Sequence, residues 1–203
     1  MTAMEPRPLL EVKGLSKRFG GFIALDGVDL DVQPGERLGL IGPNGSGKST
    51  FVNCVCGTLH NEAGTVRFAG HALNGLPAHR RTHIGLARSF QLPRPFMSLS
   101  LADNLRVPLL YTVRRRSGLI RSGTDLDQRC MELLAQVGLD AKATRMPSDL
   151  TQVEMRKLEL ARAMAAEPKL LIADESMAGL SHSEVEEIIA LLLRLTRRAS
   201  PSS

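Results

Sequence analysis

The sequence predicts an α/β fold in which helices cover a largely parallel sheet. Two short apolar runs, residues 38–41 and residues 170–173, have the length and composition of strands buried on both faces. A glycine-rich loop follows the first run and leads into a helical segment ending near Gly57, which is a strand, loop, helix unit. With 203 residues and 43% hydrophobic content, the chain is long enough to bury a core.

The N-terminal part is expected to contain short strands after a flexible tail, residues 1–8. Val28, Leu30 and Val32 alternate with two aspartates, which is the period of a half-buried strand. Pro34 and the glycine after it then turn the chain.

The second half is predicted to be mostly helical. One helix should be capped by Thr124 and end at Gly138, with one apolar face made of Leu126, Cys130, Leu133, Leu134 and Val137. Another should begin at Thr151 and end before Pro168. The last begins around Ser183, with glutamates in its first turn and arginines near its end, as the helix dipole favours.

Composition excludes several classes of protein. No run approaches the roughly 18 apolar residues of a membrane span, and the N-terminus lacks the apolar segment of a signal peptide, so a cytoplasmic protein is expected. Cys54, Cys56 and Cys130 fit neither a zinc site nor a disulfide framework and are interpreted as buried thiols. The net charge of +5 suits anionic ligands, but seven aromatic residues give little material for stacking nucleic-acid bases.

The stretch GPNGSGKST matches the phosphate-loop pattern G-x-x-x-x-G-K-[ST] between a predicted strand and a predicted helix. Its glycines let the backbone wrap around phosphate oxygens, Lys48 would reach the β- and γ-phosphates, and Ser49 would bind Mg²⁺. The predicted ATP-binding residues of this loop are Gly42, Pro43, Asn44, Gly45, Ser46, Gly47, Lys48, Ser49 and Thr50.

A second acidic motif follows the apolar run at 170–173. Asp174 stands at the carboxyl end of that predicted strand, where a carboxylate can hold the water shell of Mg²⁺. Glu175 comes one residue later and could orient and deprotonate an attacking water, which makes it the candidate catalytic residue.

With these motifs in place, the chain from about residue 10 to residue 195 resembles the ATPase subunit of an ABC transporter. KRFGG…ALDGV resembles the family's adenine-stacking loop and implies that Phe19 lies against the base. ARSFQ resembles the Q-loop, which implies that Gln91 contacts Mg²⁺ and water and senses the membrane partner, and MAGLS resembles the D-loop. RFGGFIALDGV, ARSFQ and DNLRVPLL most resemble the subunits of branched-chain amino-acid importers.

The resemblance implies a P-loop NTPase fold with a RecA-like core, a small antiparallel β region and an inserted helical subdomain. The core would comprise residues 9–92 and 158–198, the helical subdomain residues 93–157, and a tail residues 199–203. Two such subunits, identical or related, would enclose two ATP molecules. They would dock on a membrane permease near Gln91 and the helical subdomain, at the inner face of the cell membrane, with no nucleic-acid partner.

The family signature L-S-G-G-Q is replaced here by LTQVE, formed by Leu150, Thr151, Gln152, Val153 and Glu154. Val153 puts a branched side chain where the signature has glycine, so a weakened site is expected. The pattern T-x-x-E also reads as a capping box, which would occupy the N–H groups that a phosphate would otherwise bind. A variant that still hydrolyses ATP and one specialised for a slower role both stay open.

No histidine follows His182, whereas the family continues with a buried strand that ends in a catalytic histidine. The last core strand is therefore expected to be missing, which leaves residues 38–41 and 170–173 with unpaired edges unless they shift together. A truncated or frame-shifted product, a fragment, and a natural solvated tail all fit. We expect an ATP-binding importer subunit that hydrolyses ATP weakly or not at all, or alternatively a hydrolysis-deficient nucleotide-binding regulatory or scaffold protein. The transported solute stays open.

Overall fold

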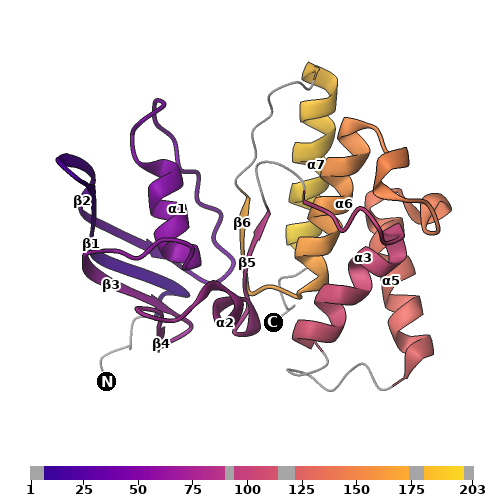
Figure 1. Ribbon diagram of the computed structural model, residues 1–203, viewed down its shortest axis with the longest axis horizontal. Coiled ribbons are helices and arrows are strands. Elements are labelled where there is room, and N and C mark those ends of the chain that lie inside the picture. Colours follow the sequence, from indigo (N-terminus) through magenta and orange to yellow (C-terminus); the bar gives the residue numbers. More distant parts are fainter. Residues whose placement is uncertain (1–6, 90–93, 114–121, 174–180, 199–203) are drawn as a thin grey trace, which may run out of the picture. The chain divides into compact units, whose positions relative to one another are not determined.

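The computed structural model describes residues 7–89, 94–113, 122–173 and 181–198. The chain forms two compact units, residues 1–86 and residues 87–203. The first is built on an antiparallel sheet with helices α1 and α2, and the second is mainly helical (Figure 1).

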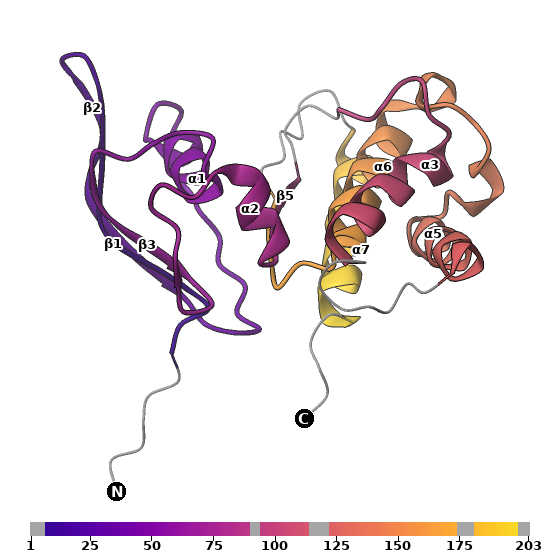
Figure 2. The same ribbon diagram turned by 60° about the horizontal axis from the view of Figure 1, so that its bottom comes forward.

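The first unit contains a four-stranded sheet in the order β2-β1-β3-β4, with antiparallel neighbours (Figure 2). Its strands are β1 (Leu10–Phe19), β2 (Phe22–Val32), β3 (Ala63–Phe68) and β4 (His71–Ala72). In β2, Val32 is buried whereas the aspartates at 29 and 31 are exposed, which confirms the predicted alternation. The sheet also confirms the antiparallel β region that the resemblance implied.

Helix α1 (Lys48–Cys56) packs with its apolar side inward and ends at Gly57, as predicted. Gly57 adopts the left-handed conformation, with φ of 78°, and its N–H bonds to carbonyls of the last turn. The buried residues of α1 are Phe51, Val52, Cys54, Val55 and Cys56. A shorter helix, α2 (Ala78–His83), follows β4.

The strand predicted at residues 38–41 does not form, so that prediction is wrong. Leu38 is 50% exposed, Leu40 43% and Ile41 95%, and the segment has no regular secondary structure. A strand is stable only when a neighbour takes up its backbone hydrogen bonds. None of the six strands in the described part of the chain pairs with this segment.

The second unit has four main helices, which lie side by side (Figure 1). They are α3 (Leu101–Pro108), α5 (Gly123–Val137), α6 (Gln152–Ala165) and α7 (His182–Arg198). A π-helical turn, η1 (Leu109–Val113), continues α3, and the short 3₁₀ turns η2 (Asp140–Lys142) and η3 (Pro147–Asp149) lie between α5 and α6. Strands β5 (Leu86–Ser89) and β6 (Leu170–Ala173) form a separate two-stranded sheet.

These helices share one hydrophobic core. It joins residues from both sides of the predicted boundary at 157, among them Leu105, Leu134, Leu158 and Ile188. The division into a core (9–92 with 158–198) and an inserted subdomain (93–157) stays a prediction.

Two local predictions for α5 have different outcomes. Ser122, not Thr124, caps α5: its hydroxyl accepts the Asp125 N–H, and the Asp125 carboxylate accepts the Ser122 N–H. A capping box that begins two residues earlier therefore outcompetes the predicted cap. Gly138 ends the helix as predicted, with φ of 73°.

Strand β6 forms where residues 170–173 predicted one, but its side chains are half-buried or exposed instead of fully buried. All three cysteines are free thiols inside their units, as the sequence predicted. Among the residues with described positions, we find no helix whose length and apolar character would let it cross a membrane.

Candidate nucleotide-binding site

The loop before α1 takes the backbone shape that its glycines allow. Gly45 and Gly47 have φ of 85° and 87°, a region that other residues rarely adopt. A Cβ on Gly47 would lie 2.5 Å from the carbonyl oxygen of Ala24 in β2. The loop therefore passes so close to the sheet that only glycine fits at this position.

Lys48, the first residue of α1, folds its ammonium back over the loop. Its Nζ donates hydrogen bonds to the carbonyls of Gly42 (2.6 Å) and Pro43 (2.7 Å) and lies 3.4 Å from Ser46 Oγ. The loop thus encircles a positive charge, where an anionic group would be attracted.

The N-terminus of α1 is open to an anion. Gly47 supplies no side-chain cap, and the first turn holds no acidic residue. The first intrahelical bond runs from Phe51 N–H to Gly47 O at 2.8 Å, so the N–H groups of the preceding residues have no partner inside the helix. Those N–H groups, the helix dipole and the exposed Ser49 hydroxyl form a phosphate-binding arrangement.

Phe19, predicted to stack on adenine, ends β1 in the same unit and is 50% exposed. The ammonium of Lys17 lies 5.4 Å from the centre of its ring and also pairs with Glu62. An exposed aromatic face is available for stacking, and the adenine contact stays a prediction.

The signature-like motif lies at the start of α6, where the capping box predicted by T-x-x-E is present. Thr151 Oγ1 accepts the Glu154 N–H (3.3 Å), and Glu154 Oε2 accepts the Thr151 N–H (3.0 Å). The other oxygen of Glu154 bonds to Lys142 Nζ at 2.6 Å. This bond and those from Thr151 lower the pKa of Glu154.

The remaining signature-like residues have different surroundings. Val153 is only 8% exposed and belongs to the helical core, so its branched side chain does not project from the start of α6. Leu150 packs against the same core, and Gln152 is exposed.

Gln91, Asp174 and Glu175 lie outside the described residues. The structure therefore brings together the loop and Ser49, while the other predicted Mg²⁺ contacts stay predictions. Within the described ranges, no group of three or more His, Cys, Asp or Glu could hold a metal ion. Ser49 is the predicted Mg²⁺ contact that lies within the described loop, and its exposed hydroxyl at the open helix start fits that role.

Two buried polar residues were not anticipated from the sequence. Arg81 is 3% exposed and Asn104 is fully buried. Their residue types usually lie at the surface, and neither belongs to an apolar periodic pattern, so no sequence signal marked them as interior.

The glycine-built loop, its enclosed lysine and the uncapped helix define a P-loop nucleotide-binding protein. Residues 25–178 match the ABC transporter family. A branched-chain amino acid transport ATP-binding protein of Pseudomonas aeruginosa, BraF, is 35% identical over 197 residues, covering 93% of this chain and 77% of BraF. LivG of Escherichia coli K12, also a branched-chain amino acid transport ATP-binding protein, is 36% identical over 197 residues. That alignment covers 93% of this chain and 77% of LivG. The chain therefore belongs to the ABC transporter family, as an ATP-binding subunit.

Solved structures agree with this assignment. The ADP conformation of MJ1267, an ATP-binding cassette of an ABC transporter, superimposes with a TM-score of 0.80 at 28% identity, covering 95% of this chain and 78% of MJ1267. A dimeric post-hydrolysis cassette, MJ0796 bound to ADP and phosphate, gives 0.80 at 27% identity, covering 94% and 84%. These similarities confirm the P-loop NTPase fold expected from the sequence.

Proposed function

We propose that the chain is the ATP-binding subunit of an importer for branched-chain amino acids and works at the inner face of the cell membrane. The observation that carries the proposal is the loop at residues 42–50, with its enclosed ammonium and open helix N-terminus. The likeness to BraF and LivG supports the choice of solute.

In this proposal the loop binds the phosphates of ATP with Mg²⁺. Lys48 exchanges its carbonyl contacts for the β- and γ-phosphates, the α1 N–H groups bind phosphate oxygens, and Ser49 binds the metal. Phe19 stacks on adenine, and Gln91 and Asp174 complete the metal surroundings.

The proposed partners are a second ATPase subunit, identical or related, and transmembrane permease subunits. The dimeric form of MJ0796 supports the first partner. The transport role in the names of BraF and LivG supports the second. Docking would use the surface near Gln91 and the helical segments after it.

Hydrolysis is proposed to be slow, with Glu175 orienting the attacking water. The capping box occupies the Glu154 N–H and the Thr151 hydroxyl, two groups at the helix start that a phosphate from a partner subunit would need. The ion pair with Lys142 partly neutralises the Glu154 carboxylate and so reduces its repulsion of phosphate.

The same capping box favours a second candidate, a nucleotide-binding regulatory or scaffold protein that uses ATP to change shape. Tight ATP binding without turnover, unaffected by Glu175→Gln, supports this candidate. Turnover that Glu175→Gln abolishes supports the importer subunit.

Binding is tested by calorimetry with MgATP. Lys48→Met should weaken binding about 100-fold or more because it removes the cation from the loop. Lys13→Met is the matched control, because Lys13 pairs with Asp31 on the surface of the same unit. Equal binding by both variants would contradict the proposal.

Transport is tested by expressing the chain in an Escherichia coli strain that lacks LivG and measuring leucine uptake. Restored uptake that requires Lys48 supports the assignment to branched-chain amino acids. Co-purification with a different permease would redirect the solute assignment while leaving ATP binding intact.

A further inference from the structure

Arg81 forms an unusual buried contact in the first unit. It is 3% exposed, and its guanidinium donates four hydrogen bonds to backbone carbonyls. Nη1 bonds to the carbonyls of Cys54 (2.8 Å) and Val55 (2.7 Å), Nη2 to that of Leu73 (2.8 Å), and Nε to that of Leu76 (2.8 Å).

Two of these carbonyls belong to the last turn of α1, where the helix itself supplies few N–H donors, and the Cys54 carbonyl also accepts the Gly57 N–H at 3.2 Å. A cation at this end also matches the negative pole of the helix dipole. The other two carbonyls lie in the segment between β4 and α2. Arg81 therefore fastens the C-terminus of α1 to a neighbouring segment of the unit.

Among the residues that the structure describes, the groups that shift the pKa of Arg81 include no carboxylate. Burial lowers the pKa of Arg81, and negative charge on the thiol of Cys56 or Cys54 would oppose that shift. Because neutral thiols carry no charge, the guanidinium is a net positive charge at the C-terminal end of α1.

Gly57 provides the space for this contact. A Cβ at this position would lie 2.5 Å from Arg81 Nε and 2.8 Å from its Cζ. Any larger residue at 57 must push the guanidinium away from the end of α1.

The opposite end of α1 carries Lys48 and the open N–H groups of the phosphate loop. Nine residues at 1.5 Å each put the two ends about 13 Å apart. We propose that Arg81 is a positioning residue for nucleotide binding, which fixes α1 along its axis and adds positive potential toward the phosphates. This inference rests on the proposed ATP binding by the loop.

The first test compares Arg81→Met with Arg80→Met by calorimetry, well below the melting temperature of each variant. Arg80 is the exposed neighbour on α2, so its substitution removes the same charge from the surface. Arg81→Met should raise the Kd for MgATP about tenfold, and Arg80→Met less than about twofold. Arg81→Lys, which keeps the charge and part of the hydrogen bonding, should recover most of the affinity.

A purely structural role would lower stability without changing the preference among nucleotides. Since ATP carries more phosphate charge than ADP, Arg81→Met should weaken MgATP more than MgADP. The ratio of the two Kd values is therefore the decisive readout, and it does not depend on the folded fraction.

The second test displaces the guanidinium without removing it. Gly57→Ala should weaken MgATP at least about fivefold, whereas Gly75→Ala should leave it unchanged. Gly75 also has a positive φ, 73°, but a Cβ there meets no atom within 4 Å, so it controls for backbone strain.

Unchanged MgATP affinity in folded Arg81→Met would overturn the inference. If that variant does not fold, Gly57→Ala decides, and wild-type affinity in it overturns the inference equally. Absence of MgATP binding by the unmodified chain is a different result, because it removes the proposed function as well.

Discussion

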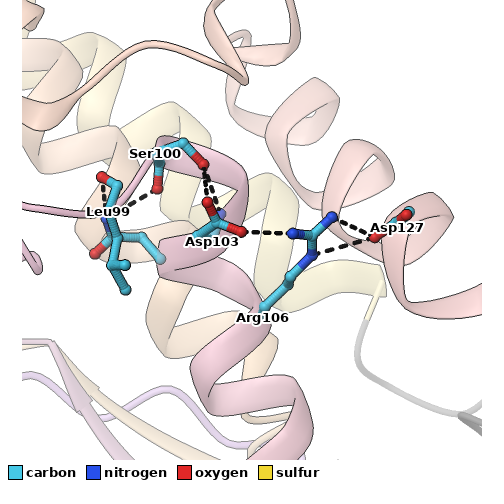
Figure 3. Close-up of polar contacts among 6 residues, drawn as sticks. Leu99, Ser100, Asp103, Arg106 and Asp127 are labelled. Atoms are coloured by element: carbon cyan, nitrogen blue, oxygen red, sulfur yellow. Dashed lines mark hydrogen bonds and ion pairs between the residues drawn. The ribbon is translucent and has the colours of Figure 1, made fainter. Parts of the chain in front are cut away.

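Arg106 on α3 binds Asp127 on α5 through two N–H groups, Nε at 3.1 Å and Nη2 to the same oxygen. Its remaining terminal nitrogen bonds to Asp103 one turn earlier on α3. Figure 3 shows the guanidinium between the two carboxylates, with Asp103 also held by the Ser100 hydroxyl. This chain of polar contacts joins the start of α3 to a second helix.

Removing the cross-helix partner should cost a modest amount of stability. Asp127→Ala is expected to lower the free energy of unfolding by about 0.5–1 kcal/mol, because the pair is partly exposed and screened by solvent. Urea unfolding at low and high salt measures this, and the difference should shrink as salt rises. Glu132→Ala, which breaks an ion pair within α5 alone, should change stability less.

The same network predicts a pH dependence. The Ser100 hydroxyl, followed by the Arg106 charge, lowers the pKa of Asp103 in the folded protein. A lowered folded pKa means that this stabilisation is complete above the unfolded pKa, near 4, and is lost as pH falls through the folded pKa. Asp103→Asn should therefore be less stable than the parent chain at pH 7, and denaturation curves of the two should converge at acid pH. A difference that persists at acid pH would contradict this cause.

Asn104 holds the segment before α3 in place. Its amide donates to the carbonyls of Phe96, Leu99 and Ser100 at 3.0–3.1 Å, and its oxygen accepts the Phe96 N–H. Asn104→Ala should lower the free energy of unfolding by about 2–3 kcal/mol, since buried backbone groups lose their partners. Thermal unfolding measures the loss. The half-buried Asn61, whose amide bonds to two carbonyls, is the control and should cost less than about 1 kcal/mol when replaced by Ala.

Two glycines of the phosphate loop allow the cost of a strained φ to be measured separately from the cost of a steric clash. Gly47→Ala combines a strained φ with a clash against Ala24, whereas Gly45→Ala has the strained φ but open space. Gly47→Ala should therefore destabilise the first unit by several kcal/mol and abolish MgATP binding, while Gly45→Ala should cost about 1–2 kcal/mol. Equal effects would mean that the loop does not pass as close to β2 as the structure shows.

Burial raises the pKa of the Cys130 thiol to about 11. At pH 8 it should react with a disulfide reagent at least about 100-fold more slowly in the folded chain than in urea. A raised folded pKa also means that stability is complete below pH 9 and falls as pH rises toward 11. Cys130→Ala should flatten that alkaline fall, which pH-dependent unfolding can measure.

The features predicted correctly from the sequence are those whose cause is local. The phosphate loop is fixed by glycines and one lysine within nine residues, and the Thr151 capping box by two residues three apart. The helix end at Gly138 likewise depends on one residue that tolerates positive φ.

The failure at the α5 cap is local, since Ser122 lies two residues from the predicted Thr124, but other failures depend on distant partners. Residues 38–41 have strand composition, but no described strand takes up their hydrogen bonds. The buried position of Arg81 depends on carbonyls up to 27 residues away, which no periodic pattern reveals. Val153 is expected from the sequence to disturb the signature-like motif at the surface, but its position on α6 places its side chain in the helical core.

Ile41, 95% exposed, immediately precedes the first glycine of the phosphate loop. A surface that covers this isoleucine would also restrain the backbone that grips a nucleotide. Thermodynamic reciprocity then applies: if such contact strengthens nucleotide affinity by some factor, nucleotide strengthens the contact by the same factor. Association at this isoleucine and occupancy of the loop by nucleotide would then be thermodynamically coupled.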